Sequence, residues 1–420
     1  MRVKVKVCIL TTSFPRFRGD PAGIFIYHLA ARLAQKGIQV HVIAPGDPGA
    51  NYFEYWDNIH IYRFPYFWPR KYQRLGYRDG LLNNLRNSRL AVAQTPSFVL
   101  AEFLYLLFIL KKRKIDLIHA HWSLPQGLLC IMAKYALKVP CVTTFHGSDI
   151  FGLRHPIFRS LNKLVISHSD ICTANSRATS AMALKISGCE NTRLIPMGVN
   201  PLQFQKTTEG VDLRKKLQLN GEVILSVGRL IDLKGTEYLI KALAIVFLEF
   251  PKAKAIIIGS GPRKNQLLNL ARDLQLSDNI LFMDEVPHTE LVQYYSLADV
   301  FVLPSVKNKT GETEGFGVVL LEAIACGLAV IGSNVGGIPD IIKDGETGLL
   351  ARPNDPHDLG NQIIRLLSDG NLREKVVLKA QRLINANFSW EVIADRFIAT
   401  YNDVLGYNPT GRKDKAAPHI

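Results

Sequence analysis

The chain has 420 residues, which is long for one hydrophobic core and predicts two domains of roughly 200 residues each. Hydrophobic residues make up 47% of the sequence and charged residues 21%, a composition that excludes a largely disordered or low-complexity chain. The net charge of +15 lies in the N-terminal half, because residues 1–200 hold 26 Lys and Arg against 10 Asp and Glu, whereas the remainder holds 25 against 26. Such a basic half suits nucleic acid, an anionic membrane, an anionic substrate or a merely solubilising surface.

The cysteines and the N-terminus indicate the compartment. Most of the six cysteines lie in apolar runs, and none shows Cys-x2-Cys spacing; they are Cys8, Cys130, Cys141, Cys172, Cys189 and Cys326. We expect buried, reduced thiols of a cytosolic protein. The first ten residues alternate and then run apolar, which is typical of a first strand and not of a signal peptide.

Short β-branched runs alternate with segments of helical period, and the pattern occurs twice along the chain. Strands are predicted at 3–10, 38–44, 115–120, 139–145 and 170–174, and then at 222–227, 255–259, 280–283, 300–304 and 329–333. This alternation predicts two parallel sheets covered by helices. A polar stretch with Gly198 and Pro201 predicts the linker between them. Because ligands of such sheets bind beyond the carboxyl ends of the strands, we expect two domains that face a central cleft.

Two motifs follow strands of the first half. Gly19-Asp20-Pro21-Ala22-Gly23 precedes a helix predicted at 25–36, and Gly23 would let a phosphate or an acceptor approach the backbone. His146 ends a strand at a His-Gly turn, where it can donate a hydrogen bond to a hydroxyl or an oxyanion, and Asp149 would orient it or bind sugar. A structural role is the alternative for this histidine. His119 and His121 lack a third ligand at metal spacing and are interpreted as packing or acceptor-pocket residues.

Residues 62–89 interleave seven aromatic residues with seven Lys or Arg. The mixture suits a membrane interface, with single-stranded nucleic acid as the less favoured partner. The apolar run at 97–110, followed by Lys111-Lys112-Arg113-Lys114, is too short to span a bilayer and contains Glu102. We interpret it as a buried helix, with an interfacial helix as the alternative.

The second half carries a basic motif and a glycine motif after its first two strands. Gly228-Arg229 and Lys234-Gly235 place two cations where a sheet presents its ligand site, which suits a diphosphate. A surface basic pair is the alternative. Gly259-Ser-Gly261-Pro lacks the third glycine of a dinucleotide fingerprint, so it predicts a tight turn and only weakly an NAD-dependent oxidoreductase.

The richest stretch runs from Pro304 to Leu350. Glu314 and Glu322 flank the start of a predicted helix, where backbone N–H groups attract anions and carboxylates accept hydrogen bonds from sugar or ribose hydroxyls. For Glu322 alone, a carboxylate that merely favours the helix dipole is the alternative. No Asp-x-Asp sequence occurs in the chain. We therefore expect Arg229, Lys234 and helix termini to neutralise the phosphates without a metal.

Together these motifs resemble the family 4 retaining glycosyltransferases of the GT-B fold. The shared pattern is a glycine loop after the first strand, a His-Gly turn, Gly-Arg-x4-Lys-Gly and Glu-x7-Glu, in this order across residues 5–400. One departure is Asp340, where many members have Glu. The resemblance implies catalytic roles for His146, Glu314, Arg229 and Lys234. It also implies a donor site made of Gly23, Asp149, Gly228, Arg229, Lys234, Val286, Glu314, Gly315, Phe316, Gly317, Val318 and Glu322.

Within that resemblance, Arg229 and Lys234 would bind the donor diphosphate, Glu322 the ribose and Glu314 the transferred sugar. His146 would lie near the 6-hydroxyl, and Gly23 against a phosphate on the acceptor side. Backbone groups at Glu285 and Val286 would hold the base. Gly336-Gly337 would complete the pocket. Members of the family are thought to react on one face of the sugar, where the departing phosphate oxygen helps to deprotonate the acceptor.

The expected fold is therefore α/β, GT-B, with two doubly wound Rossmann-like domains. Residues 1–205 would bind the acceptor and 206–387 the donor, while a helix at 388–405 would pack back on the first domain, before a tail at 406–420. We expect a UDP- or GDP-sugar donor, a glycan or lipid-linked acceptor, no cofactor and no nucleic acid. The location would be cytoplasmic, with the inner face of the cell membrane as a peripheral alternative. The competing functions are a soluble sugar-phosphate synthase, a nucleotide-sugar epimerase and a noncatalytic sugar-nucleotide binding module.

Overall fold

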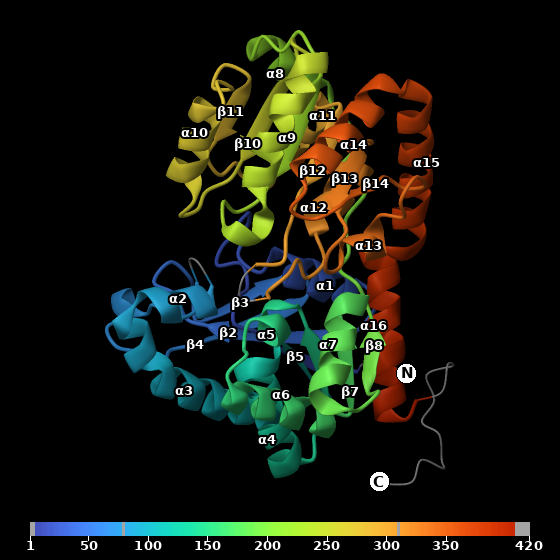
Figure 1. Cartoon of the computed structure of the whole chain (residues 1–420). Helices are drawn as coiled ribbons and strands as arrows, with labels where there is room; N and C mark the ends of the chain where they lie inside the picture. Colours follow the sequence, from blue (N-terminus) through green and yellow to red (C-terminus); the bar gives the residue numbers. More distant parts are fainter. Residues whose placement is uncertain (1–4, 78–79, 309–310, 408–420) are drawn as a thin grey trace. The chain divides into compact units, whose positions relative to one another are not determined.

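The chain folds into two compact α/β units in a computed structural model that describes residues 5–77, 80–308 and 311–407 (Figure 1). Unit 1 comprises Met1–Asn175, Thr179–Ile195 and Ile393–Ile420, and unit 2 comprises Ser176–Ala178 and Pro196–Val392. Apart from the short segment Ser176–Ala178, the chain passes between the units after Ile195 and after Val392, whereas the expected boundaries follow residues 205 and 387. Most of the tail expected at 406–420 lies outside the described residues.

Unit 1 is built on an eight-stranded sheet of order β3-β4-β2-β1-β5-β6-β7-β8, parallel except for β3, which pairs antiparallel with β4. Its strands are β1 Lys6–Leu10, β2 Gln39–Pro45, β3 Phe53–Trp56, β4 Ile59–Phe64, β5 Leu117–His121, β6 Cys141–Phe145, β7 Ile171–Ala174 and β8 Thr192–Leu194. Its helices are α1 Ile24–Gln35, η1 Arg70–Tyr72, α2 Leu81–Asn87, α3 Arg89–Arg113, η2 Ser123–Gly127, α4 Leu128–Leu137, α5 Ser148–Phe151, α6 Pro156–His168, α7 Arg177–Ser187, which starts in the part counted with unit 2, and α16 Trp390–Leu405.

Unit 2 has a six-stranded parallel sheet of order β11-β10-β9-β12-β13-β14. Its strands are β9 Val223–Val227, β10 Lys254–Ile258, β11 Ile280–Met283, β12 Val300–Leu303, β13 Ala329–Ser333 and β14 Leu349–Ala351. Its helices are α8 Thr208–Lys216, η3 Asp232–Lys234, α9 Thr236–Glu249, α10 Lys264–Asp273, α11 Leu291–Leu297, α12 Val318–Ala325, α13 Ile338–Ile341, α14 Pro356–Ser368 and α15 Gly370–Asn387. The two doubly wound sheets confirm the predicted fold class.

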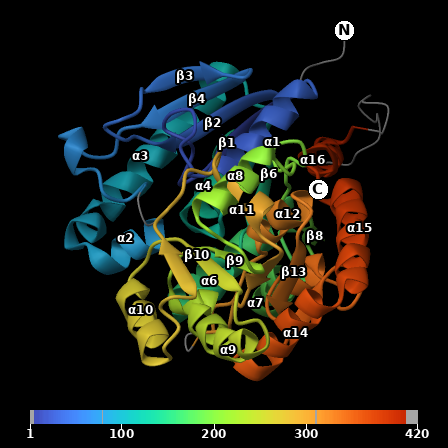
Figure 2. The same cartoon turned by 90° about the horizontal axis from the view of Figure 1, so that it is seen from above.

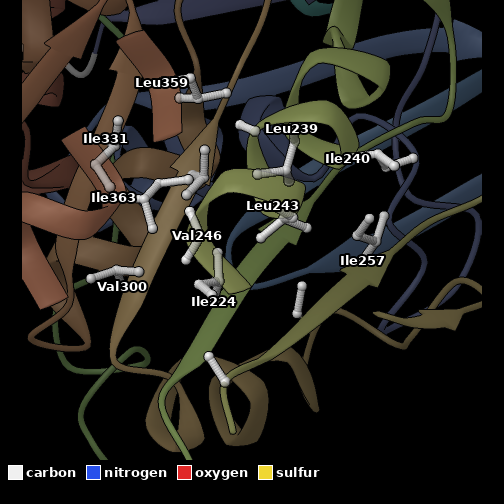
Figure 3. Packing of buried hydrophobic residues seen from close by; sticks show 14 of the residues in the cluster. Ile224, Leu239, Ile240, Leu243, Val246, Ile257, Val300, Ile331, Leu359 and Ile363 are labelled. Carbon is white, nitrogen blue, oxygen red and sulfur yellow. The ribbon is translucent and has the colours of Figure 1, made fainter. Parts of the chain in front are cut away.

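The core of unit 2 forms where α9 and α14 lie side by side over the sheet (Figures 2 and 3). Leu243 and Val246 of α9 and Ile363 of α14 are fully buried against Ile224 of β9 and Ile331 of β13. The strands carry continuous apolar runs because both faces of a parallel sheet are covered. This packing holds the carboxyl ends of β9, β10 and β12 in fixed register, which positions the loops that follow them.

The last described helix, α16, belongs to unit 1 beyond residue 392. Ser389 caps it, since its hydroxyl accepts a hydrogen bond from the Val392 N–H at 3.4 Å. The Tyr401 hydroxyl lies 2.7 Å from Nδ1 of His119, whose Nε2 lies 2.7 Å from the Thr144 hydroxyl. Burial lowers the pKa of His119 to about 3, so the ring is neutral and links α16 to β5 and β6.

The aromatic and basic segment at 62–89 differs from the exposed patch that its composition suggested. Tyr62, Phe64, Tyr66 and Tyr77 are buried, and the Arg63 guanidinium is fully buried, where it donates to the Tyr77 hydroxyl at 2.9 Å. The strand β4 takes up the first part of this segment, and its last four residues, 61–64, are all buried. Among its described aromatic side chains, only Trp68 and Tyr72 are exposed.

Two further expectations need correction. Cys189 is exposed in the turn after α7, whereas the other five cysteines are buried thiols. The predicted apolar helix is longer than the run at 97–110, and it is neither wholly buried nor wholly interfacial. It forms the 25-residue α3, whose inner face packs on unit 1 and whose outer face exposes leucine and phenylalanine. Among the helices that the structure describes, α3 alone is long and apolar enough to cross a membrane, a test that core helices also pass.

Candidate active site

The candidate donor site in unit 2 centres on an ion pair between a half-buried lysine and a buried glutamate. Lys234 ends η3, and its Nζ lies 2.7 Å from Oε2 of Glu314, which also accepts a hydrogen bond from the Ser305 hydroxyl at 2.9 Å. Glu314 is 8% exposed. Burial by itself would raise the pKa of Glu314, but the Lys234 ammonium, the Ser305 hydroxyl and the Arg229 charge together lower it below the usual value. The carboxylate is therefore held ionised, with one oxygen saturated.

The loop that carries Glu314 is held by two glycines. Gly337 donates its N–H to the Glu314 carbonyl at 3.0 Å. Gly336 has a φ of +56°, and a Cβ at this position would lie 2.0 Å from the Glu314 carbonyl oxygen. A Cβ on Gly337 would lie 2.4 Å from the Gly315 carbonyl oxygen. The Gly-Gly sequence thus allows the close approach to the backbone of the Glu314 loop.

Glu322 lies on α12, which begins after Gly317. Its Oε1 is 2.9 Å from Nε2 of His288, and its Oε2 accepts a hydrogen bond from the Tyr295 hydroxyl at 2.8 Å. The side chain is 5% exposed. Burial opposes protonation of His288, but the neighbouring Glu322 raises its pKa above the ordinary value. Both oxygens thus have fixed partners and keep further lone pairs for other hydrogen-bond donors.

The residues around α12 divide into core and backbone positions. Phe316 is 2% exposed and packs against the Phe388 ring, with 5.9 Å between ring centroids. A donor contact from Phe316 would therefore come from its backbone. Gly315 and Val318 are half-buried at the start of the helix. Asp340 lies in the first turn of α13 and accepts a hydrogen bond from the Arg177 N–H at 2.6 Å, a contact within unit 2.

The cationic loop after β9 lies against the loop after β10. Gly228 donates its N–H to the Ile258 carbonyl at 3.0 Å, and Arg229 is exposed. A Cβ on Gly259 would lie 2.0 Å from the Gly228 carbonyl oxygen, and one on Gly261 would lie 2.4 Å from the Leu230 carbonyl oxygen. These glycines therefore allow two loops to touch, which agrees with a tight turn and not with a dinucleotide fingerprint.

The predicted base-binding residues follow β11. The Glu285 carboxylate accepts a hydrogen bond from the Ser260 hydroxyl, which connects this loop to the one after β10. Val286 is half-buried beside it. The loops after β9, β10, β11 and β12 thus all leave the same end of the parallel sheet, as the binding rule for such sheets requires.

In unit 1, His146 lies among aromatic rings at the end of β6. Its centroid is 5.1 Å from that of Phe25 and 5.0 Å from that of Trp122, and its ring stacks on His121. Burial lowers the pKa of His146 to about 3, so this ring is neutral at pH 7. A neutral imidazole at this position donates or accepts a hydrogen bond but cannot deliver a proton as an imidazolium.

The tautomer of His146 follows from its neighbour. Nε2 of His146 lies 2.9 Å from Nδ1 of His121, and Nε2 of His121 is buried without a hydrogen-bond partner. A buried N–H without an acceptor costs more than a buried bare nitrogen, since unpaired donors are rarer in folded proteins. We therefore assign the His121 proton to Nδ1, from which it donates to Nε2 of His146, and the His146 proton to Nδ1.

Asp149 stabilises the turn that presents His146. Its Oδ1 accepts hydrogen bonds from the His146 and Gly147 N–H groups, both at 3.1 Å, and its Oδ2 accepts one from the Ser123 N–H at 2.9 Å. The carboxylate is buried, and burial raises the pKa of Asp149 to about 6 despite these backbone hydrogen bonds. Asp149 thus orients the backbone of His146, one of the two roles that the sequence suggested.

Gly23, the remaining predicted residue, precedes α1. A Cβ at this position would lie 2.3 Å from the Ser13 carbonyl oxygen, so the close approach that requires glycine occurs within unit 1 itself.

Ser305, His288 and Tyr295 were not predicted as site residues. Ser305 lies two residues after the end of β12, which is a usable signal, because ligands bind beyond strand ends in such sheets. The contacts of His288 and Tyr295 with Glu322 join positions 34 and 27 residues apart, and no spacing rule predicts them. Within the described part of the chain, no three His, Cys, Asp or Glu side chains form a group that could hold a metal ion.

Comparison with known proteins identifies the class that this fold and these clusters define. Residues 22–202 match the family described as "Glycosyltransferase Family 4", and residues 212–383 match "Glycosyl transferases group 1". A GDP-mannose-dependent monoacylated alpha-(1-6)-phosphatidylinositol monomannoside mannosyltransferase from Corynebacterium glutamicum is 30% identical over 69% of this chain and 76% of its own length. The chain belongs to the family 4 glycosyltransferases.

Two other similarities span nearly the whole chain. The N-acetyl-alpha-D-glucosaminyl L-malate synthase of Bacillus anthracis is 25% identical over 98% of this chain and 100% of its own length. The structure of a sucrose-phosphate synthase from Thermosynechococcus elongatus superposes with a TM-score of 0.76 at 25% identity, covering 96% of this chain and 100% of the other. The GT-B fold expected from the sequence is confirmed.

Proposed function

We propose that this glycosyltransferase moves a sugar, with retention of anomeric configuration, from a UDP- or GDP-sugar to a hydroxyl of a glycan or lipid-linked acceptor, without a divalent metal or another cofactor. The observation that carries the proposal is the ion pair of half-buried Lys234 with buried Glu314 beside Arg229, where loops leave the carboxyl ends of parallel strands. Two cations and one ionised carboxylate at such a point suit a diphosphate that is joined to a polyol.

The donor would be held along this cluster. Arg229 and Lys234 bind the diphosphate and stabilise it as it departs, which is electrostatic stabilisation by preorganised charges. Oε1 of Glu314 accepts hydrogen bonds from hydroxyls of the transferred sugar, since Oε2 already accepts hydrogen bonds from Lys234 and Ser305. Glu322 accepts hydrogen bonds from ribose hydroxyls, while His288 and Tyr295 hold its carboxylate in place.

The transfer step needs no enzymatic nucleophile. The acceptor oxygen bonds to the anomeric carbon as the bond from that carbon to the phosphate oxygen breaks. The departing phosphate oxygen takes the proton of the acceptor hydroxyl on the same face. His146 contributes a hydrogen bond from its neutral ring to a sugar hydroxyl. Glu314 is a positioning carboxylate, because its ion pair with Lys234 lowers its nucleophilicity.

The relatives support two classes of acceptor. The Corynebacterium relative carries a phosphatidylinositol mannoside in its name, which favours a lipid-linked acceptor in cell-surface glycolipid or polysaccharide assembly. The names of the Bacillus and Thermosynechococcus proteins contain malate and sucrose phosphate, which favour a soluble acceptor as the second candidate. A lipid-linked acceptor is preferred because unit 1 exposes a basic and apolar helix. The corresponding location is cytoplasmic, peripheral on the inner face of the cell membrane.

A transfer assay with Glu314→Gln tests the proposal. The variant keeps the size of the side chain but loses the charge that faces Lys234, so transfer should fall about a hundredfold or more while the fold persists. Glu312→Gln in the same loop is the matched control and should stay within about threefold of the wild type. Reactions in EDTA should proceed unchanged, and NMR should report a retained anomeric configuration. Undiminished transfer by Glu314→Gln, or an inverted product, would contradict the proposal.

A further inference from the structure

The outer face of α3 is an exposed apolar strip. Leu100, Leu104 and Phe108 are 58%, 56% and 51% exposed. They are four residues apart, so they form one row that extends about 12 Å along the helix. Val92 is also exposed nearer to the start of the helix. Helices at a water-exposed surface normally place charged residues at such positions, and a contiguous apolar row marks an interaction surface.

Cations flank this strip at both ends. Lys111, Lys112 and Lys114 are exposed at the C-terminal end, and Arg89 is exposed at the N-terminal end. The Lys112 ammonium lies 4.9 Å from the centroid of the Phe108 ring, so a positive charge borders the apolar row directly. Glu102 is the only acidic residue between positions 89 and 113, and it is buried on the opposite face. The exposed face of α3 thus combines apolar side chains with purely positive charge.

The inner face of α3 is tied to unit 1 by polar contacts. The Gln94 side chain donates to the Tyr72 carbonyl at 2.7 Å and accepts from the Arg74 N–H at 3.1 Å. Gln126 donates to both oxygens of Glu102, at 3.0 and 3.2 Å. A helix that left unit 1 to span a bilayer would carry these polar groups into hydrocarbon without their partners, which is costly. The helix therefore stays on unit 1 and offers only its outer face.

We propose that the outer face of α3 docks on an anionic lipid bilayer, with Leu100, Leu104 and Phe108 among the acyl chains and the lysines at the headgroups. A helix with one apolar face and flanking cations lies in the interface plane, held by apolar burial and by attraction to anionic lipid. A second copy of the chain fits less well. Both ends of α3 are basic, so parallel and antiparallel pairing of two copies would each oppose like charges.

This docking surface deepens the proposed function, and its role in acceptor access rests on that function. A lipid-linked acceptor stays in the bilayer, so an enzyme held at the headgroups meets it in two dimensions. Docking itself depends on α3, and no residue of α3 belongs to the proposed donor site. The two can therefore fail separately.

The test is flotation of the full-length protein with vesicles of phosphatidylglycerol and phosphatidylcholine, compared with vesicles of phosphatidylcholine alone. The wild type should bind the anionic vesicles at low ionic strength and lose most of the binding in high salt. The double variant Leu100→Glu/Leu104→Glu should bind about tenfold or more weakly, because two charges would enter the apolar layer. The double variant Lys111→Ala/Lys112→Ala should lose about tenfold at low salt.

Matched controls lie on α15 of unit 2. Leu378 is 49% exposed, and Lys375 and Lys379 are exposed on the same helix. Leu378→Glu makes the same kind of change at one position, Lys375→Ala/Lys379→Ala removes two lysines as on α3, and both should leave vesicle binding unchanged. All these positions are exposed, so the variants should fold, which circular dichroism and melting would check.

Three outcomes would overturn the docking surface. They are binding that is unaffected by the α3 variants, equal binding to both kinds of vesicle, and a wild-type mass in light scattering that is twice that of Leu100→Glu/Leu104→Glu. The last would show that α3 pairs with a second copy. In the same samples, a nucleotide-sugar should raise the melting temperature of the wild type and of the α3 variants equally. Vesicle binding without this rise would leave the docking surface standing and contradict the proposed function.

Discussion

At the scale of single residues, each functional carboxylate has a distinct set of partners. Glu314 pairs with a lysine and a serine, and Glu322 with a histidine and a tyrosine. The partners of Glu314 are a lysine and a serine, whereas His288 is an imidazole, the side chain whose ordinary pKa lies nearest to neutrality, and Glu322 raises the pKa of His288 further. The Glu322 cluster is therefore the part of the proposed donor site that should respond to pH.

His288→Gln tests this response. The pKa of His288 is raised in the folded protein by Glu322, so its stabilising contribution is complete below the ordinary imidazole value and is lost as the pH rises through the folded value. The variant should melt at a lower temperature than the wild type. This deficit should be about 1–3 °C larger at a pH of about 5.5 than at about 8.5. Calorimetry at both values measures the difference. An equal deficit at the two values would mean that the charge of His288 does not contribute.

The residues that the sequence could predict are those with a motif. Lys234, Glu314 and Glu322 follow from Gly-Arg-x4-Lys-Gly and Glu-x7-Glu, and the structure brings Lys234 and Glu314 together. The partners of Glu322 could not be predicted, because they come from residues before α11 and within it. For His121 the sequence predicts only a packing or acceptor-pocket role. Its hydrogen bond to His146, which sets the tautomer of His146, depends on the register of β5 and β6.

At the scale of elements, long strands with continuous apolar runs were predictable, and short or mixed ones were not. β1, β2, β5, β6 and β7 of unit 1, and β9 to β13 of unit 2, all coincide with predicted runs within a few residues. β8 and β14 have three residues each, too few for a pattern to register. β4 is not predictable, because its sequence, Ile-His-Ile-Tyr-Arg-Phe, mixes charge with aromatic residues and predicts an exposed segment, whereas Arg63 is fully buried.

The loop that carries Glu314 gives a prediction at this scale. Gly336→Ala should cost about 3 kcal/mol or more of the free energy of unfolding, because backbone strain adds to the overlap with the Glu314 carbonyl. Gly345→Ala is the control, since Gly345 has a similar φ of +69° with no atom within 4 Å of its Cβ position. This control should cost only the strain, about 1–2 kcal/mol. Denaturant unfolding measures both, and equal losses would contradict the account of the Glu314 loop.

At the scale of the whole molecule, the segments on either side of unit 2 are hydrogen-bonded to each other near residues 199 and 388–390. The Val199 N–H donates to the Phe388 carbonyl at 2.8 Å, and the Trp390 N–H donates to the Val199 carbonyl at 3.1 Å. The α16 helix then buries Phe397 and Tyr401 in unit 1. Each unit has its own core, which length and repeated alternation predicted, but the position where α16 is anchored depends on His119 and was not predictable.

Two phenylalanines should separate the stabilities of the units. Phe397 is buried in unit 1, 5.0 Å from the His119 ring, and Phe388 is buried in unit 2 beside Phe316. Each change to Ala should lower the free energy of unfolding of the unit that contains the cavity by about 3–5 kcal/mol. In calorimetry, the two variants should lower the temperatures of different unfolding transitions. A single transition lowered equally by both would show that the units unfold together.

Donor binding in EDTA tests the central claim most directly, because it needs neither the acceptor nor the linkage. We predict that at least one sugar nucleotide among UDP-, GDP- and ADP-sugars raises the melting temperature of the wild type in the presence of EDTA. The rise should disappear in Lys234→Met, which removes the cation beside Glu314, and persist in Lys307→Met, which removes an exposed lysine. Failure of all three classes to stabilise the wild type, or full stabilisation of Lys234→Met, would contradict a metal-free donor site at Lys234 and Glu314.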